Sequence, residues 1–416
     1  MMQLQSAVPI QTLSNGIRVV FLPTSSPVAH LGVTVLGGSR YEKHAEIGLA
    51  HFLEHCIFKG TQKRKTFHVL SRIDSVGGEL NAYTTKEEIC VYASFVKEHL
   101  ERSIELLADI ILHSNFPQKE IEKEKEIVID EINSYLDSPS DRIFDDFEKN
   151  LFQQHPLGEN ILGSSESVNS FTQQNLQQYL RRFFHAKNMV ISVVGDFKSK
   201  KLFHLLEKHF LEVPNNQPII TPEKFISSSP FSIRSQESNF QSHGNIGGIA
   251  PGYDNEKERR ALMLLTNVLG GPALNSRLTL AIREKYGYTY SIEANYTPFQ
   301  EVGYWNIYFG CDQKYVDKTL KLVKKELKKV RENAFSTINL HRAKEQYKGQ
   351  IALSMESNSG QMLGFGKSAL IFNEIQSVQE VYQAIEEITS EDILSVANQY
   401  FEESKISQLI YLQKED

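Results

Sequence analysis

The sequence predicts an α+β fold made of two homologous halves, each a mixed β-sheet packed with long helices. Three observations predict it. Short apolar runs typical of strands alternate with long amphipathic helical patterns. The same order of elements recurs about 216 residues later, and a proline-rich segment separates the two copies. A chain of 416 residues is also longer than one compact core usually allows.

The first half contains strand patterns followed by helical patterns. They are a hairpin over residues 12–22, a strand over 31–36, and helices over 46–58, 98–113 and 118–136. Asn15-Gly16 predicts the hairpin because these two residues readily take the positive φ angles of a tight turn. In 46–58, apolar residues recur at spacings of three and four, which indicates a helix with one buried face. The last helix must end before Pro139, which cannot continue it.

Two passages of the second half repeat the first in order and spacing. Residues 172–184 and the apolar run after them match 389–401, and the strand-to-helix passage 91–108 matches 304–324. Between the copies, four prolines and three consecutive serines indicate an extended linker. The sequence therefore predicts an N-terminal domain over 1–213, a linker over 214–230 and a C-terminal domain over 231–416.

Composition limits the kinds of partner and compartment. The chain has 45 Lys and Arg against 51 Asp and Glu, so its formal net charge is -6 and no basic field attracts nucleic acid or an anionic membrane. Three scattered cysteines are too few for a disulfide framework and favour a reducing compartment. The sequence shows neither a secretory signal pattern nor an apolar run long enough to span a membrane. We expect a cytoplasmic protein.

The helix predicted over 46–58 carries the strongest chemical signal. His51 and His55 are four residues apart, so both imidazoles project from one face of the helix and can bind one metal ion. Glu54 lies to the side of that face, where it can reach a water on the metal and act as general base. The alternative is an ordinary helix with incidental histidines, and H-x-x-E-H arises by chance in on the order of a few per cent of chains this long.

The order H-x-x-E-H is the inverzincin signature. The chain resembles the inverzincin zinc metallopeptidases of the pitrilysin family, and it is similar to the smaller bacterial relatives of mitochondrial processing peptidase. The likeness runs through both halves. Its segments are GGSR at 37–40, FKGT at 58–61, GGELNAYT at 77–84, HPLG at 155–158, ILG at 161–163, SRL at 276–278 and REK at 283–285.

The resemblance also implies the third ligand of the metal site and a carboxylate that supports it. Catalytic zinc usually has three protein ligands and one open position, so two histidines need a third donor. The family takes it from a glutamate about 76 residues later, which is Glu131 here. The site then holds one Zn2+ per chain on His51, His55 and Glu131. Glu124 lies two helical turns before Glu131, and the resemblance makes it a supporting carboxylate of the catalytic site.

The resemblance also implies residues that contact the substrate. In the second half, Arg283 and Tyr290 match a pair that contacts substrate or the tetrahedral intermediate. The spacing R-x6-Y is weak alone, and its value comes from its position in the repeat. Residues 77–85 resemble an exposed edge strand beside the zinc, where Asn81 and Ala82 would line a groove for an extended peptide. The alternative is an ordinary interior strand.

The implied function is that of a zinc metalloendopeptidase that hydrolyses oligopeptides or extended unfolded segments inside a closed chamber. The implied partner is a second copy of the chain, each copy forming one half of a clamshell. Two alternatives are a non-catalytic subunit and an active subunit of a heterodimeric processing peptidase. The presence of His51, Glu54, His55 and Glu131 argues against the first, and Arg283 with Tyr290 argues against the second.

Overall fold

The computed structural model describes residues 8–216 and 218–414, and their contacts form two compact units. The first unit runs up to Asn133 and adds Glu159–Pro222 and Ser354–Gln379. The second unit comprises Ser134–Gly158, Glu223–Leu353 and the residues from Glu380 onward. Each unit therefore includes a helical segment from the half of the sequence that supplies most of the other unit. The division of the sequence into 1–213, 214–230 and 231–416 stays a prediction.

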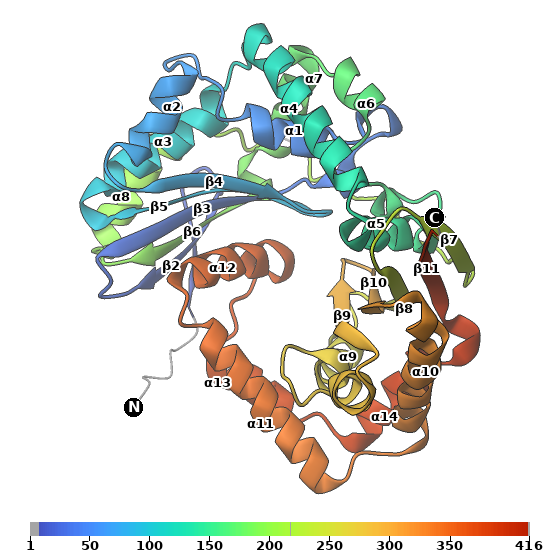
Figure 1. Cartoon of the computed structure of the whole chain (residues 1–416). Coiled ribbons are helices and arrows are strands. Elements are labelled where there is room, and N and C mark those ends of the chain that lie inside the picture. The colour runs from blue at the N-terminus through green and yellow to red at the C-terminus, as the bar shows by residue number, and fades with distance from the viewer. Residues whose placement is uncertain (1–7, 217, 415–416) are drawn as a thin grey trace. The chain divides into compact units, whose positions relative to one another are not determined.

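The first unit contains a six-stranded mixed sheet with the order β1-β2-β6-β3-β5-β4 (Figure 1). Its strands are β1 Ile10–Thr12, β2 Arg18–Pro23, β3 Val28–Leu36, β4 Glu79–Thr84, β5 Glu88–Val96 and β6 Met189–Gly195. Neighbouring strands are antiparallel except β2 and β6, which are parallel. The strand β4 lies at the edge of the sheet beside β5, as the sequence predicted for the segment 77–85.

Helices cover both faces of this sheet (Figure 1). One face carries α1 Leu49–Cys56, α2 Thr66–Asp74, α3 Leu100–His113, α4 Gln118–Leu136, α6 Ser165–Ser170, α7 Gln173–Phe183 and α8 Ser199–Phe210. The other face carries α12 Asn358–Phe372, which packs on β3 and β6. The side chains of β2 point alternately to the two faces of the sheet. Val19 and Phe21 lie in the large core, whereas Val20 and Leu22 face α12.

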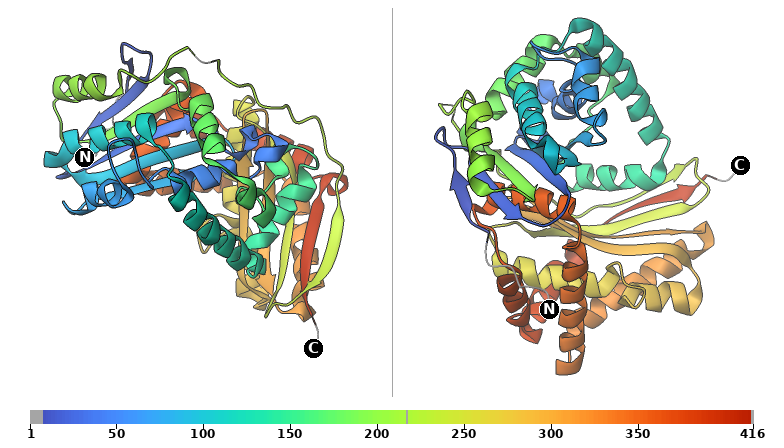
Figure 2. Two further views of the ribbon diagram at one scale, coloured as in Figure 1. Left: turned by 90° about the horizontal axis from the view of Figure 1, so that it is seen from above. Right: turned by 90° about the vertical axis from the view of Figure 1, so that its left-hand side faces the viewer.

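The second unit contains a five-stranded mixed sheet with the order β7-β11-β8-β10-β9. Its strands are β7 Ser232–Glu237, β8 Ser242–Pro251, β9 Thr289–Pro298, β10 Val302–Cys311 and β11 Ser407–Gln413. Its helices are α5 Pro139–Leu151, α9 Glu256–Gly270, α10 Val316–Glu332, α11 Thr337–Ser354, α13 Val378–Glu386 and α14 Ser390–Tyr400. The strand β11, red in Figure 2, runs parallel to the yellow-green β7 although the two are far apart in sequence.

The predicted fold class is confirmed, since both units are mixed sheets packed with helices. The repeated passages also adopt the same elements. Thr172 caps the helix α7 before β6, and Thr389 caps the helix α14 before β11, each by accepting a hydrogen bond from the backbone three residues later. Among residues 8–216 and 218–414, none of the helices combines the length and apolar character needed to cross a membrane.

The tight turn predicted at Asn15-Gly16 is wrong in detail. Thr12 pairs with Arg18, so the loop is longer than a two-residue turn, and of the two residues only Gly16 has a positive φ, of 96°. The side chain of Asn15 is buried and donates to the backbone oxygen of Phe210 at 2.8 Å. The loop conformation is therefore set by packing against α8 as well as by local turn preference.

Candidate metal centre

The helix α1 begins at Leu49, where Gly48 precedes it and the buried side chain of Glu42 caps its start. Gly48 has a φ of 94°, which L side chains rarely adopt, and it packs closely on the backbone of residues 162–163. The carboxylate of Glu42 accepts hydrogen bonds from the backbone N–H groups of Gly48 at 2.9 Å and Ala50 at 2.6 Å. Burial raises the pKa of Glu42 to about 8, although the two backbone N–H groups act in the opposite direction. This capping explains why the helix starts later than the predicted range 46–58.

Three side chains meet at one point beside α1. His51 and His55 come from α1 and Glu131 comes from α4, and their nearest donor atoms all lie within 4.8 Å of one another. The Nε2 of His51 is 3.8 Å from Oε1 of Glu131, and the Nε2 of His55 is 3.3 Å from Oε2 of the same carboxylate. These are the three residues that the sequence predicted as metal ligands.

The donor set fits zinc. Bonds of about 2.0 to 2.2 Å in a tetrahedral site put the ligand atoms roughly 3.4 Å apart, close to the 3.3 and 3.8 Å seen here. Burial, and then the charge of His55, lower the pKa of His51 to about 4. His51 is therefore neutral at physiological pH, which is the form that binds a metal. Three protein donors leave a fourth position, as catalytic zinc sites require.

Glu124 supports the ring of His55 from the side opposite Glu131. Its Oε2 lies 3.5 Å from Nδ1 of His55, and its Oε1 lies 2.8 Å from Nζ of Lys59. Burial would raise the pKa of Glu124, but the hydrogen bonds with His55 and Lys59 outweigh it and lower the pKa. Glu124 is therefore ionised, which favours a proton on Nδ1 of His55 and leaves Nε2 free to bind a metal.

Glu54 lies on α1 next to the three donors without being one of them. Its side chain is half-buried, and burial raises its pKa. The hydroxyl of Thr84 and the charge of His55 act against that rise, whereas the charge of Glu131 adds to it. A carboxyl with a raised pKa accepts and returns a proton more readily near neutral pH than an exposed one. The role of Glu54 as general base stays a prediction.

The edge strand β4 contacts α1 and carries both predicted peptide-binding residues. Asn81 is exposed, and its Oδ1 accepts a hydrogen bond from the backbone N–H of Ala82 at 2.8 Å. The side chain of Ala82 packs into the core with 9% exposure. A bound peptide could therefore contact the backbone of Ala82 but little of its side chain.

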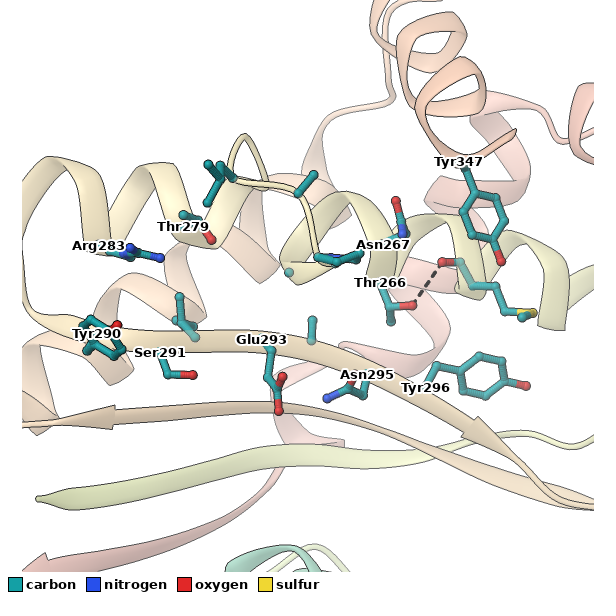
Figure 3. Close-up of a pocket in the computed structure, with 18 residues that line it drawn as sticks. Thr266, Asn267, Thr279, Arg283, Tyr290, Ser291, Glu293, Asn295, Tyr296 and Tyr347 are labelled. Atoms are coloured by element: carbon teal, nitrogen blue, oxygen red, sulfur yellow. Dashed lines mark hydrogen bonds between the residues drawn. The ribbon is translucent and has the colours of Figure 1, made fainter. Parts of the chain in front are cut away.

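Arg283 and Tyr290 belong to the second unit, where they lie together at one end of a pocket between α9 and β9 (Figure 3). The pocket has a volume of about 560 Å³. The guanidinium of Arg283 lies 5.6 Å from the centre of the Tyr290 ring, a cation–π contact, and Tyr290 is 81% exposed. Tyr296 and Tyr347 lie at the other end of the pocket (Figure 3).

Sequence reasoning missed three residues that shape this centre. Glu42 caps α1, Lys59 pairs with Glu124, and Thr84 affects the pKa of Glu54. Lys59 lies beyond α1, which ends at Cys56, and its partner Glu124 is on a later helix, so no local spacing indicates this pair. Nothing in the local sequence around Glu42 or Thr84 indicates their contacts.

A helix with H-x-x-E-H whose two histidines converge with a glutamate from a later helix has the inverzincin motif, and these three side chains could hold a metal ion. The chain belongs to the insulinase family of peptidases, family M16. The family model described as insulinase, peptidase family M16, matches residues 18–165. The model described as the peptidase M16 inactive domain matches residues 170–347.

A relative supports this membership, and two solved structures share the fold. An uncharacterized zinc protease of Bacillus subtilis is 32% identical over 403 residues, which cover 96% of this chain and 97% of that protein. A crystal structure of a protease from Helicobacter pylori has a TM-score of 0.88 at 23% identity and covers 97% of this chain and 98% of its own. A structure from Pseudomonas fluorescens, described as a peptidase M16 inactive domain, has a TM-score of 0.90 at 18% identity and 98% coverage of both chains.

Proposed function

We propose that this protein is a zinc-dependent metalloendopeptidase that hydrolyses peptide bonds in oligopeptides or extended unfolded segments. The observation that carries the proposal is the convergence of His51, His55 and Glu131 with Glu54 beside them. Relatives of nearly equal length are named zinc proteases, which supports the same activity. The presence of all four side chains argues against a non-catalytic subunit.

In this proposal, each residue of the site has a separate chemical role. Zinc, when bound, would lower the pKa of a water molecule and polarise the peptide carbonyl. His51, His55 and Glu131 would hold the ion, and Glu124 would keep the His55 ring oriented. Glu54 would accept the proton of the attacking water and pass it to the amine that leaves. The raised pKa of Glu54 suits both transfers, because the carboxyl must first gain and then release the proton.

The edge position of β4 supports an extended substrate. An edge strand presents backbone N–H and C=O groups with which a peptide can pair, and this pairing depends little on side chains. Asn81 would have to release the N–H of Ala82 when a peptide binds, since its side chain occupies that donor. We propose that Arg283 and Tyr290 also contact the peptide. Their exposure and shared pocket support this role.

We further propose that two copies of the chain form a closed chamber in the cytoplasm. Both the metal donors and the Arg283–Tyr290 pair are present in one sequence, so no second kind of chain is needed to supply them. Light scattering of the purified protein tests the dimer. A monomeric mass together with full peptidase activity would reject it, and co-purification of a homologous second chain would favour a heterodimer.

The decisive experiment compares the parent with Glu54→Gln. Zinc content is measured by elemental analysis and cleavage by a library of quenched peptides. We expect the variant to keep its zinc and to lose about 100- to 10,000-fold in turnover, because the metal ligands remain while the proton acceptor is gone. Glu122→Gln, an exposed carboxyl on α4, is the matched control and should cleave like the parent. Unchanged cleavage in Glu54→Gln would reject the assigned base, and a parent without peptidase activity would reject the function.

A further inference from the structure

A further cavity of the second unit lies between α9 and α11, beside the loop that follows α9. Its volume is about 280 Å³, and its walls include Val268 of α9, residues 275–277 of the loop and one face of α11. The two helices are packed together, since Ala343 of α11 belongs to the core of this unit and Nδ2 of Asn267 donates to Oε1 of Gln350 at 2.7 Å. All residues that line the cavity belong to the second unit.

The face of α11 that lines this cavity is polar and partly open to solvent. Asn339, Arg342 and Gln346 line the cavity, and they follow one another by three and four residues, so they share one face of the helix. Asn339 and Arg342 are exposed, and Gln346 is half-buried. A molecule in solution can therefore reach the cavity, and this wall presents hydrogen-bonding groups to it.

Arg277 lines the cavity from the loop, and its guanidinium is held in place from one side. Its Nε and Nη2 donate to Oε2 of Glu326 at 3.3 and 3.1 Å, and the buried Glu326 also accepts from Nζ of Lys329 at 2.5 Å. Within the described residues, Nη1 of Arg277 has no hydrogen-bond partner. A guanidinium that is already oriented loses little conformational freedom when it binds a ligand through its remaining donors.

Arg342 gives the cavity a positive charge that the protein does not neutralise. In the part of the chain that the structure describes, no carboxylate forms an ion pair with Arg342, and none of the residues that line the cavity is acidic. Glu326 offsets the charge of Arg277, but nothing comparable offsets that of Arg342. The cavity therefore attracts an anion.

The other side chains of the cavity limit the kind of anion. Nδ2 of Asn275 donates to Oε1 of Gln346 at 3.0 Å, which orients the amide of Gln346 and leaves its Nε2 as a donor for a ligand. Phe335 and Val268 add apolar surface, and a few polar groups beside apolar surface are typical of small-molecule sites. The volume corresponds to roughly nine water molecules at about 30 Å³ each, enough for one small molecule.

We infer that this cavity is a binding site for a small oxyanion, a molecule that carries a phosphate or a carboxylate group. Arg342 and Nη1 of Arg277 bind the oxygens of the anion, because guanidinium donors match the geometry of both groups, and Nε2 of Gln346 adds a hydrogen bond. The site does not depend on the metal centre, whose three candidate ligands lie in the first unit.

The first test titrates the full-length protein with inorganic phosphate and, separately, with acetate by calorimetry at constant ionic strength. Saturable binding of either anion supports the inference, and the tighter one identifies the group. We expect Arg342→Gln to bind roughly 10- to 100-fold more weakly, because charge-assisted hydrogen bonds are lost, and Gln346→Met roughly 2- to 10-fold more weakly. Arg181→Gln, at an exposed arginine of α7, is the matched control and should bind like the parent. Undetectable binding of both anions, or undiminished binding in Arg342→Gln, overturns the inference.

The second test locates the bound anion by hydrogen exchange with and without phosphate. The loop after α9 borders two cavities, since residues 271–274 line the pocket of Arg283 and residues 275–277 line this one. Phosphate should slow exchange in this loop and in the first half of α11 in the parent but not in Arg342→Gln. Slowing confined to α1 would place the anion at the metal centre and overturn the inference. A parent without peptidase activity rejects the proposed function instead and leaves these outcomes unchanged.

Discussion

His55 lies between two carboxylates whose surroundings differ. Glu124 is buried and paired with Lys59, whereas Glu131 is nearly half exposed and points at both histidines. The raised pKa of His55 reflects this position, since burial lowers it but the hydrogen bond of Glu124 and the charge of Glu131 outweigh burial. Lys59 offsets the charge of Glu124, so the site keeps one supporting carboxylate and one carboxylate free to bind a metal.

Removing the supporting carboxylate should weaken zinc binding. We expect Glu124→Gln to reduce zinc affinity by about 10- to 100-fold, because the amide no longer fixes the proton of His55 on Nδ1. Lys59→Met should cause a smaller loss, since Glu124 remains but loses its partner. Chelator competition measures both. Glu126→Gln, two residues further along α4 and exposed, serves as control, and a loss there equal to that of Glu124→Gln would contradict the assigned role.

At the scale of elements, each sheet is covered on one face by a helix that comes from the other half of the sequence. The packing of α12 on β3 depends on two glycines. Met362 occupies the space that a Cβ on Gly32 would need, and Thr34 occupies the space beside Gly366. Periodicity could predict many of the helices, but it could not predict which sheet α5 or α12 covers. The partners of these helices are far away in sequence, and an apolar face does not specify its partner.

Two glycines of α12 allow a matched prediction. Gly366→Ala places a methyl group against Thr34 and should lower the free energy of unfolding of the first unit by about 1 to 3 kcal/mol. Gly364 is exposed and has open space where its Cβ would stand, so Gly364→Ala should stabilise the helix by up to about 1 kcal/mol. Denaturant unfolding of both variants measures the difference. Equal effects of both changes would show that α12 does not pack as described.

At the scale of the whole molecule, local spacing and the family resemblance indicated the three candidate metal donors, whereas no local signal indicated that the two units are interleaved. His51 and His55 share a helix face, and that local spacing could be read directly, while Glu131 was assigned by the spacing in the resembling family. The units are interleaved, with α5 and α12 exchanged between the halves of the sequence. The contacts that decide unit membership form across long stretches of chain, and neither composition nor internal repeats contain that information.

Removal of zinc should therefore destabilise the first unit more than the second. The three candidate donors lie in the first unit, so bound zinc would stabilise that unit by about 2.7 kcal/mol at a free concentration 100 times the dissociation constant. We expect a chelator to lower the thermal midpoint of the parent and to speed hydrogen exchange in α1 and β4, while β8 and β10 in the second unit keep their rates. His51→Ala is the control, because a chelator should hardly change its midpoint. A chelator effect of equal size in that variant would mean that zinc binds elsewhere.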